Sequence, residues 1–210
     1  MAKVALHHLD YIIFDFETTG LDPNQGDEII EIGAIKLRGS EVTGEIYQTL
    51  VHIHKPIPRQ ASSIHGITDK ELENQPPIEE VFPQFLKFIG KKTLIAHNAA
   101  FDLGFIKKNL ERFPNLSFTN SCIDTLQISK HFFSYEKGHS LAAIAKRLSI
   151  SSDEKSHRSL ADCKLTSKIF AEFLKLLKRR NIATLHDIRN CILPPPKICR
   201  TRAQESLALL

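Results

Sequence analysis

The sequence predicts an α/β fold in which a mixed five-stranded sheet carries helices on both faces. Two observations lead to this prediction. Near the N-terminus, three strand-like segments follow one another with short links between them, which is typical of an antiparallel meander. After about residue 61, short apolar strand-like segments alternate with segments whose apolar residues recur at helical spacing. This order favours further strands joined through helices that pack on the sheet.

The meander is expected from residues 10–17, 28–37 and 45–53. The turn signal TTGLDPNQGD separates the first two segments, and RGSEVTG is expected to connect the second to the third as a hairpin. Side chains alternate across a strand. In the first strand this alternation places on one face Tyr11, Ile13, Asp15 and Glu17, and on the other Ile12, Phe14 and Phe16.

Helices and two further strands are expected after the meander. ASSIHGITDKEL indicates a loop with short helical pieces, and Pro76-Pro77 then opens a helix that runs through Ile89. A strand is expected at 93–98, followed by a helix with the apolar stripe Leu103, Ile106, Leu110 and Phe113. A fifth strand is expected at 120–125, followed by helical stretches at 125–132 and 139–149. The last expected helix, at 158–180, has on one face Leu165, Ile169, Phe173 and Leu177.

The C-terminal segment differs from the rest of the chain. Three prolines after Leu193 cannot join a helix or a sheet ladder and indicate a stiff spacer. We therefore expect one domain at residues 1–180, followed at residues 181–210 by a helix, the proline-rich spacer and a tail.

Composition limits the classes of function. In 210 residues, 42% are hydrophobic, which is enough for a substantial core, but no apolar run is long enough to cross a bilayer. The start, MAKVALHH, lacks the apolar stretch of a secretion signal, so we expect a cytoplasmic protein without membrane contact. The net charge of +4 permits a nucleic-acid partner without requiring one. Reduced thiols are expected at the four widely spaced cysteines, Cys122, Cys163, Cys191 and Cys199.

Four acidic residues and one histidine carry the functional signal. They are Asp15 and Glu17 in DFETTGLDP, Asp102 in AHNAAFD, and His157 and Asp162 in HRSLAD. Bringing these carboxylates together is unfavourable unless cations compensate them. The set therefore predicts a site for divalent metal ions beside a titratable base, which is suited to phosphodiester hydrolysis.

Each of these residues also has an ordinary structural explanation. A D-x-E pair on a strand is most often a pair of surface acids, although here the strand is otherwise very apolar. Asp102 lies in the first turn of its helix, where the helix dipole favours an acid, and Asn98 is a natural N-cap. A histidine in a polar loop, such as His157, is usually only solvated. The combination of all five residues in one sheet topology favours the functional interpretation.

These motifs also carry a resemblance to a known family. FDFETTGLDPNQGDEIIEIGAI, ASSIHGIT, LIAHNAAFDLGFI, CIDTLQISKHFF and GHSLAAIAKRL leading to HRSLADCKLT resemble the 3′–5′ exonucleases that have an Asp-Glu-Asp-Asp core and a histidine. Within that family, the chain is most similar to the proofreading epsilon subunits of bacterial replicative DNA polymerases. The resemblance implies a ribonuclease H-like fold and two Mg²⁺ or Mn²⁺ ions. It also implies that Asp15, Glu17 and Asp162 hold the first ion, that Asp15 and Asp102 complete the second site, and that His157 is the general base.

The resemblance further implies how a substrate would bind. A frayed or single-stranded DNA 3′ end would lose nucleoside 5′-monophosphates, with a DNA polymerase subunit as partner. Glu17 would also contact the 3′-hydroxyl. Thr18 and Leu21 would cradle the terminal nucleotide. The other residues that would contact it are Ile64, His65, Asn98 and Phe101, although Ile64 and Phe101 could equally fill the core and His65 and Asn98 could equally be polar loop residues.

Two questions stay open at the level of sequence. The terminal residues Gln204, Leu207 and Leu209 resemble the peptide by which bacterial replication proteins dock on the sliding clamp, but a frayed amphipathic end is an equal explanation. The catalytic motifs do not indicate whether the substrate contains deoxyribose or ribose, so an RNA-trimming exoribonuclease is an alternative function. A non-catalytic nucleic-acid-binding or polymerase-scaffolding module is a further alternative function, and the intact acidic set argues against it.

Overall fold

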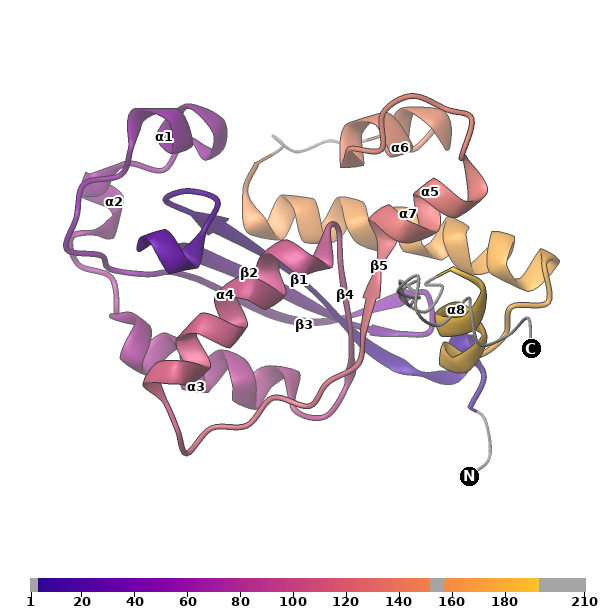
Figure 1. The fold of residues 1–210 in the computed structure, drawn as a ribbon, viewed down its shortest axis with the longest axis horizontal. Coiled ribbons are helices and arrows are strands. Elements are labelled where there is room, and N and C mark those ends of the chain that lie inside the picture. The colour runs from indigo at the N-terminus through magenta and orange to yellow at the C-terminus, as the bar shows by residue number, and fades with distance from the viewer. Residues whose placement is uncertain (1–3, 152–156, 193–210) are drawn as a thin grey trace, which may run out of the picture.

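A five-stranded mixed sheet forms the centre of the protein (Figure 1). The computed structural model describes residues 4–151 and 157–192. The strand order is β3-β2-β1-β4-β5; β1 pairs antiparallel with β2 and β2 with β3, whereas β1 pairs parallel with β4 and β4 with β5. The strands are β1 (Asp10–Thr18), β2 (Ile29–Arg38), β3 (Glu41–Leu50), β4 (Thr93–Ala96) and β5 (Cys122–Asp124). This topology confirms the predicted meander followed by parallel strands.

Helices cover both faces of the sheet, as predicted. In chain order they are η1 (Leu6–His8), η2 (Pro23–Gln25), α1 (Arg59–His65), α2 (Asp69–Leu72), α3 (Ile78–Ile89), α4 (Ala99–Arg112), α5 (Thr125–Phe132), α6 (Leu141–Arg147), α7 (Ser159–Arg179) and α8 (Leu185–Cys191). In Figure 1, α3 and α4 lie on the opposite side of the sheet from the long helix α7.

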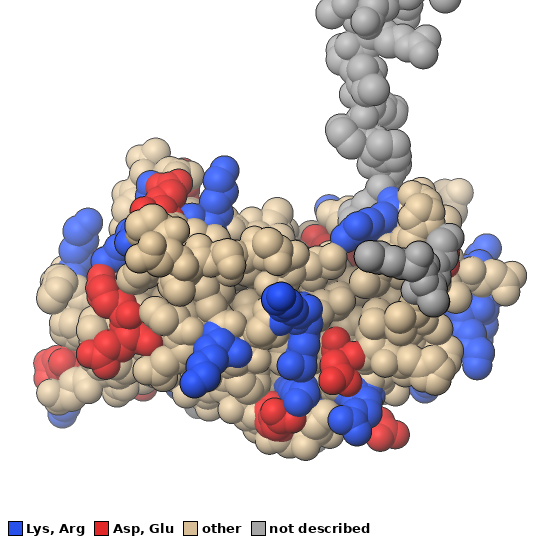
Figure 2. All heavy atoms as spheres, turned by 90° about the horizontal axis from the view of Figure 1, so that it is seen from below, with Lys and Arg blue, Asp and Glu red and all other residues tan. Residues whose placement is uncertain are grey.

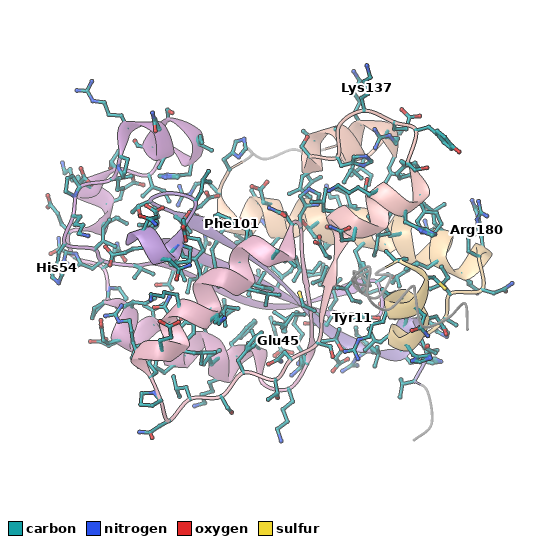
Figure 3. The ribbon with its side chains drawn as sticks, viewed as in Figure 1. Tyr11, Glu45, His54, Phe101, Lys137 and Arg180 are labelled. Atoms are coloured by element: carbon teal, nitrogen blue, oxygen red, sulfur yellow. The ribbon has the colours of Figure 1, made fainter. Side chains whose placement is uncertain are left out.

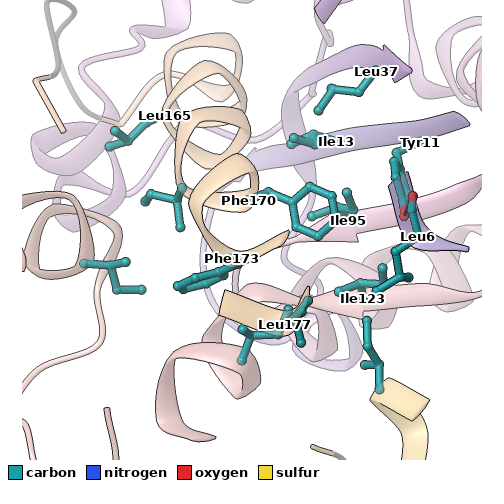
Figure 4. Packing of buried hydrophobic residues seen from close by; sticks show 14 of the residues in the cluster. Leu6, Tyr11, Ile13, Leu37, Ile95, Ile123, Leu165, Phe170, Phe173 and Leu177 are labelled. Carbon is teal, nitrogen blue, oxygen red and sulfur yellow. Dashed lines mark hydrogen bonds between the residues drawn. The ribbon is translucent and has the colours of Figure 1, made fainter. Parts of the chain in front are cut away.

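The alternation of β1 divides the core into two layers. Tyr11 and Ile13 pack with residues of α5 to α8, including Phe170 and Leu177 (Figure 4). Ile12, Phe14 and Phe16 pack instead with α3 and α4. Because β1 is buried on both faces, it is a near-continuous apolar run, and the acids that interrupt it require a specific reason. The predicted stripe of α7 is buried in the first layer, at Leu165, Ile169, Phe173 and Leu177.

The hairpin between β2 and β3 is shorter than the sequence predicts. Arg38 pairs with Glu41, so Gly39 and Ser40 alone form the turn, and Gly39 takes a positive φ of 60°. Gly44, which the sequence suggests is part of the connection, lies inside β3 with φ 88°, near an irregularity in its pairing with β2. A glycine inside a strand marks such an irregularity as readily as a turn, which explains the error.

The C-terminal helix packs on the same core layer as α7. Ile182 and Ile188 are buried there, and the backbone N–H of Leu6 donates to the carbonyl of Ala183 at 2.8 Å. The predicted tail residues Gln204, Leu207 and Leu209 lie outside the described residues, as does Cys199. The other three cysteines are free thiols.

Surface charge is mixed on the face that Figure 2 shows, where acidic and basic side chains are interspersed. The net charge of +4 is therefore not gathered into one surface there. None of the helices in residues 4–151 and 157–192 is long and apolar enough to cross a membrane.

Candidate active site

Asp15 and Glu17 lie on the central strand, near its C-terminal end. Both are partly buried, and alternation along β1 directs them to one face of the sheet. That face is the one on which α7 packs against β1 and β2.

The parallel pairing of β1 and β4 brings a third carboxylate to the same region. Asp102 lies in the first turn of α4, directly after β4, and it is 2% exposed. Its Oδ1 accepts a hydrogen bond from the backbone N–H of Phe16, the residue between Asp15 and Glu17, with 3.2 Å between the two atoms. The carboxyl ends of parallel strands meet at one edge of a sheet, which accounts for this approach.

Helix α7 delivers the fourth carboxylate because it comes unusually close to β2. A Cβ atom on Gly33 would lie 2.6 Å from the backbone carbonyl carbon of Ser159, so only glycine permits this contact. Cys163, one turn further on, is fully buried, and its Sγ lies 3.4 Å from the carbonyl oxygen of Gly33. Asp162, between them in the first turn of α7, is thereby held over the sheet with 9% exposure.

Three of the predicted ligands form one compact group. Asp15, Glu17 and Asp162 each offer a carboxylate oxygen, and these atoms all lie within 4.8 Å of one another. Asp102 is outside this group, but its charge acts on Asp15. The structure therefore brings all four predicted acids to one region.

Burial and mutual repulsion dominate the electrostatics of the cluster, and the charge of Arg158 offsets them only in part at Glu17. Burial, followed by the charge of Asp102, raises the pKa of Asp15 well above its usual range. Burial also raises the pKa of Glu17 to about 8 and, against the hydrogen bond from Phe16, that of Asp102 to about 8. The pKa of Asp162 is raised too, again mainly by burial. Carboxylates in this condition fit a cation, which would allow them all to ionise.

His157 precedes α7, as predicted, and it has an unusual backbone. Its φ is 65°, a left-handed conformation that residues other than glycine rarely adopt. Its backbone N–H donates to Oδ2 of Asp162 at 3.1 Å, and its exposed side chain lines a cavity together with that residue. The five-residue separation of His157 and Asp162 is therefore bridged as expected, with one residue before the helix and the other within it.

Two cavities flank the carboxylate group. The first, of about 410 Å³, is largely apolar, and all but one of the predicted nucleotide-contacting residues line it, namely Glu17, Thr18, Leu21, Ile64, His65 and Phe101. Figure 3 shows Phe101 in the first turn of α4. The second, of about 730 Å³, is lined by Asn98, His157, Asp162 and Lys130 among others. Asn98 lines the second cavity and not the first, although its backbone carbonyl accepts a hydrogen bond from the N–H of Phe101 at 2.9 Å.

Asn98 also differs from its expected capping role. It occupies the N-cap position of α4, but its φ is 64° and its side chain makes no capping hydrogen bond. Its backbone N–H instead donates to Oδ1 of Asp124, at the end of β5, at 3.0 Å. A cap from the neighbouring strand is a tertiary contact, and local sequence rules do not include such contacts.

Sequence reasoning missed two residues beside the site, Glu31 and Arg158. Glu31 is fully buried on β2 and forms an ion pair with Arg158, whose Nη2 lies 2.9 Å from its Oε1. Burial disfavours ionisation of Glu31, but the hydrogen bonds from Arg158 and from Ser159 outweigh it and hold the pKa of Glu31 below its usual value. The available signal was an acid inside the apolar run Ile29-Ile30-Glu31-Ile32, the same signal that identified Asp15.

Comparison with known proteins identifies the family. The sequence profile of a family described as "Exonuclease" matches residues 12–170. The chain belongs to this exonuclease family. It is therefore a nuclease by family, and the predicted resemblance is confirmed at that level.

Relatives of this exonuclease include proteins of bacterial DNA polymerase III. The chain is 39% identical over 186 residues to a DNA polymerase III subunit epsilon-like protein of Rhodobacter capsulatus, covering 88% of this chain and 26% of that protein. It is 38% identical over 180 residues to a PolC-type DNA polymerase III of Thermotoga petrophila, and the match covers 86% of this chain and 13% of that protein. It thus spans only a small part of both proteins.

The fold of the exonuclease agrees with these relationships. A solved structure of exonuclease X in complex with 5′ overhanging duplex DNA superposes with a TM-score of 0.65 at 25% identity, covering 79% of this chain and 92% of that one. The predicted ribonuclease H-like fold is confirmed.

Proposed function

We propose that this exonuclease removes nucleoside 5′-monophosphates from single-stranded or frayed DNA 3′ ends in a metal-dependent reaction. The observation that carries the proposal is the group of Asp15, Glu17 and Asp162, whose oxygens lie within 4.8 Å of one another beside an apolar cavity. The raised pKa values of Asp15, Glu17 and Asp162 support a cation as the missing partner of this group.

The proximity of Asp15, Glu17 and Asp162 supports the ligand assignment for a first ion. Asp15, Glu17 and Asp162 would hold one divalent ion, and Asp15 with Asp102 would hold a second, directly or through water. Carboxylate oxygens are the ligands that Mg²⁺ and Mn²⁺ favour. When bound, two such ions would stabilise the attacking and the leaving oxygen of an in-line displacement at phosphorus.

His157 is the residue we assign as general base. It lines the cavity that Asp162 also lines, so it lies beside one of the proposed metal ligands. It would take the proton of the attacking water as the bond from phosphorus to the 3′-oxygen of the preceding nucleotide breaks. A base placed in this way typically contributes about 10²- to 10⁴-fold in rate.

The apolar cavity fits the terminal nucleoside. Leu21 and Ile64 are 83% and 59% exposed, which is unusual for large apolar side chains and fits contact with a base. Phe101, in the same cavity wall, offers an aromatic ring for stacking.

His65 adds a hydrogen-bond donor to this cavity. Its Nδ1 accepts from the N–H of Ile67 at 3.0 Å, and burial lowers its pKa, so its Nε2 carries the proton. This Nε2 is buried and has no partner among the described residues, a condition that a bound nucleotide would relieve. Glu17 and Thr18 complete the polar part of the cavity, with Glu17 facing the 3′-hydroxyl.

We also propose partners for the exonuclease. The named relatives are DNA polymerase III proteins, which supports association with a polymerase and a role in proofreading. Gln204, Leu207 and Leu209 would bind the sliding clamp. Within the chain we propose residues 1–180 as the exonuclease domain and 181–210 as a C-terminal segment, in which α8 packs on the domain core and the tail residues would reach such partners.

One experiment tests substrate and metal together. Matched single-stranded DNA and RNA oligonucleotides with a labelled 5′ end are incubated with the full chain and Mg²⁺, Mn²⁺ or EDTA. We expect stepwise shortening of the DNA from its 3′ end, only with metal, and no turnover by the Asp162→Asn variant. Faster digestion of RNA would favour the exoribonuclease alternative, and DNA binding without turnover would favour the non-catalytic one.

A further inference from the structure

Glu31 is a buried carboxylate that lies beside the active site without belonging to its ligand group. It is fully buried and directly opposite Glu17 in the pairing of β1 and β2. Both of its oxygens accept hydrogen bonds from the start of α7, and Oε1 also accepts one from Nε2 of Gln48 on β3, at 3.1 Å. Oε1 accepts from Nη2 of Arg158 at 2.9 Å, and Oε2 accepts from Nε of Arg158 at 3.2 Å and from the backbone N–H of Ser159 at 3.0 Å.

These contacts fix the first residues of α7 from the sheet. The side chain of Arg158, the N-cap residue, makes no capping hydrogen bond, because a guanidinium has no acceptor atom. The Glu31 carboxylate caps the helix instead, because it accepts a hydrogen bond from the backbone N–H of Ser159, which lies 128 positions later in the chain. A negative charge at a helix N-terminus is also favoured by the helix dipole.

His157 is the residue directly before this fixed segment, and its backbone requires support. A φ of 65° costs free energy in a residue other than glycine, and it persists only where the surroundings enforce it. The N–H of His157 is held by Asp162, and the two following residues are held by Glu31. The strained residue is therefore fixed on both sides by carboxylates.

We propose that Glu31 and Arg158 are positioning residues that hold His157 in this conformation and so direct its ring to the reacting water, an inference that rests on the proposed function. Neither residue needs to contact the substrate for this role. Both the Nε and the Nη2 of Arg158 are engaged by Glu31, in the two-point geometry that fixes a guanidinium most firmly.

A direct phosphate contact by Arg158 is the competing explanation. The Arg158 side chain is 38% exposed, and its charge also acts on Glu17. In that case Arg158 would act on substrate binding and independently of His157. The two explanations therefore differ in KM and in how the effects of substitutions combine.

The test uses variants that do not leave a buried charge unpaired. The double variant Glu31→Gln/Arg158→Met removes both charges and keeps an acceptor for the Ser159 N–H. Removal of one partner alone would leave the charge of the other without its ion-pair partner. Arg158→Lys keeps the charge but loses the two-point contact. Lys36→Met is the control, because Lys36 on β2 forms an ion pair with Glu45 on the neighbouring strand β3.

Steady-state kinetics on single-stranded DNA are measured for each variant with and without His157→Ala. For the double variant we expect kcat to fall roughly 10- to 100-fold, within the contribution of about 10²- to 10⁴-fold from the base itself, with KM unchanged. Arg158→Lys should recover part of the loss, and Lys36→Met should leave kcat unchanged. In the His157→Ala background the double variant should cause no further loss, because it acts through His157.

A second readout does not depend on activity or on metal. The backbone ¹⁵N order parameter of His157 is measured in EDTA for the parent chain and the double variant. We expect a value near 0.85 in the parent and below about 0.6 in the variant.

Three results would overturn the proposal. They are an equal loss of kcat in both backgrounds, a rise in KM with kcat unchanged, and an unchanged order parameter in the double variant. If the parent chain had no nuclease activity, the proposed function would fail, whereas the order parameter would still decide whether Glu31 and Arg158 position His157.

Discussion

The carboxylate of Asp102 on α4 accepts the backbone N–H of Phe16 on β1, across 86 positions of sequence. Phe16 is the residue between Asp15 and Glu17, so this single hydrogen bond connects the helix that follows β4 to the strand that carries two of the proposed metal ligands. Its backbone donor cannot be removed by substituting the Phe16 side chain. The hydrogen bond therefore holds the Asp102 carboxylate against the backbone between the two β1 carboxylates.

The first prediction concerns Asp15. Burial raises the pKa of Asp15 most, and the charges of the neighbouring carboxylates raise it further, so in the absence of metal an ionised Asp15 should destabilise the fold. We expect Asp15→Asn to raise the melting temperature of the metal-free protein by a few degrees and to remove nuclease activity. Differential scanning calorimetry in EDTA and in Mg²⁺ checks this.

The metal response provides the control for Asp15→Asn. An ion that binds only the folded state at about 100 times its Kd stabilises it by about 2.7 kcal/mol. The parent chain should show such a rise with Mg²⁺, and Asp15→Asn should not. A variant that is less stable than the parent in EDTA would contradict the repulsion that we assign to the cluster.

The second prediction concerns pH. The pKa of Glu17 is about 8 in the folded protein, above its ordinary value of 4.5, so the folded state binds this proton more tightly than the unfolded state does. The resulting stability is fully present below pH 4.5 and is lost as pH rises through 8. Metal-free protein should lose at most about 1.4 kcal/mol for each pH unit in this window through this group.

Urea unfolding at several pH values in EDTA measures this loss. Glu17→Gln should flatten the profile between pH 5 and 9, and saturating Mg²⁺ should flatten it as well, because the ion compensates the charge. A parent protein whose stability in EDTA does not change over that range would be inconsistent with the raised pKa of Glu17.

Much of the fold could be predicted because its signals are local. Alternation along β1 and the helical stripe of α7 depend on neighbouring residues, and both are confirmed in the two core layers. The capping of α4 by Asp124 and the Glu31–Arg158 ion pair could not be predicted, because their partners lie 26 and 127 positions apart. The position of Glu31 inside the apolar run of β2 indicates that this acid needs a partner, but it does not indicate that the partner is Arg158.

The third prediction tests the close approach of α7 to the sheet. In Gly33→Ala, the new Cβ would lie 2.6 Å from backbone and side-chain atoms of Ser159, which must move away. We expect a loss of about 1–3 kcal/mol in unfolding free energy, since overpacking of this kind shifts backbone. Because Asp162 moves with α7, kcat should also fall, as urea unfolding and oligonucleotide digestion will show.

Gly104→Ala is the matched control for Gly33→Ala. Gly104 lies inside α4, and the nearest atom to its added Cβ would be 3.9 Å away, on Pro23. Alanine is favoured over glycine in a helix interior by about 0.5–1 kcal/mol, so this variant should be at least as stable as the parent. Equal effects of the two substitutions would show that the contact with Ser159 is not tight.

The last prediction separates substrate binding from stability. Leu21 is 83% exposed and lines the apolar cavity, so it contributes little to the folded core. We expect Leu21→Ser to leave the melting temperature unchanged and to raise KM for single-stranded DNA by roughly 5- to 50-fold, the equivalent of losing apolar contact worth about 1–2 kcal/mol. The effect on kcat should be smaller, because the Leu21 side chain has no group that could bind a metal ion or transfer a proton.

Val42→Ser supplies the comparison that makes this result specific. Val42 is also a large exposed apolar residue, 49% exposed, but it lies on β3 and not in the wall of the cavity. Its substitution should change neither KM nor kcat. If the two variants bind DNA equally well, as measured by fluorescence anisotropy with catalytically inactive Asp162→Asn protein, the apolar cavity does not receive the terminal base, and the strand must reach the carboxylates from the side of Asn98 and Lys130.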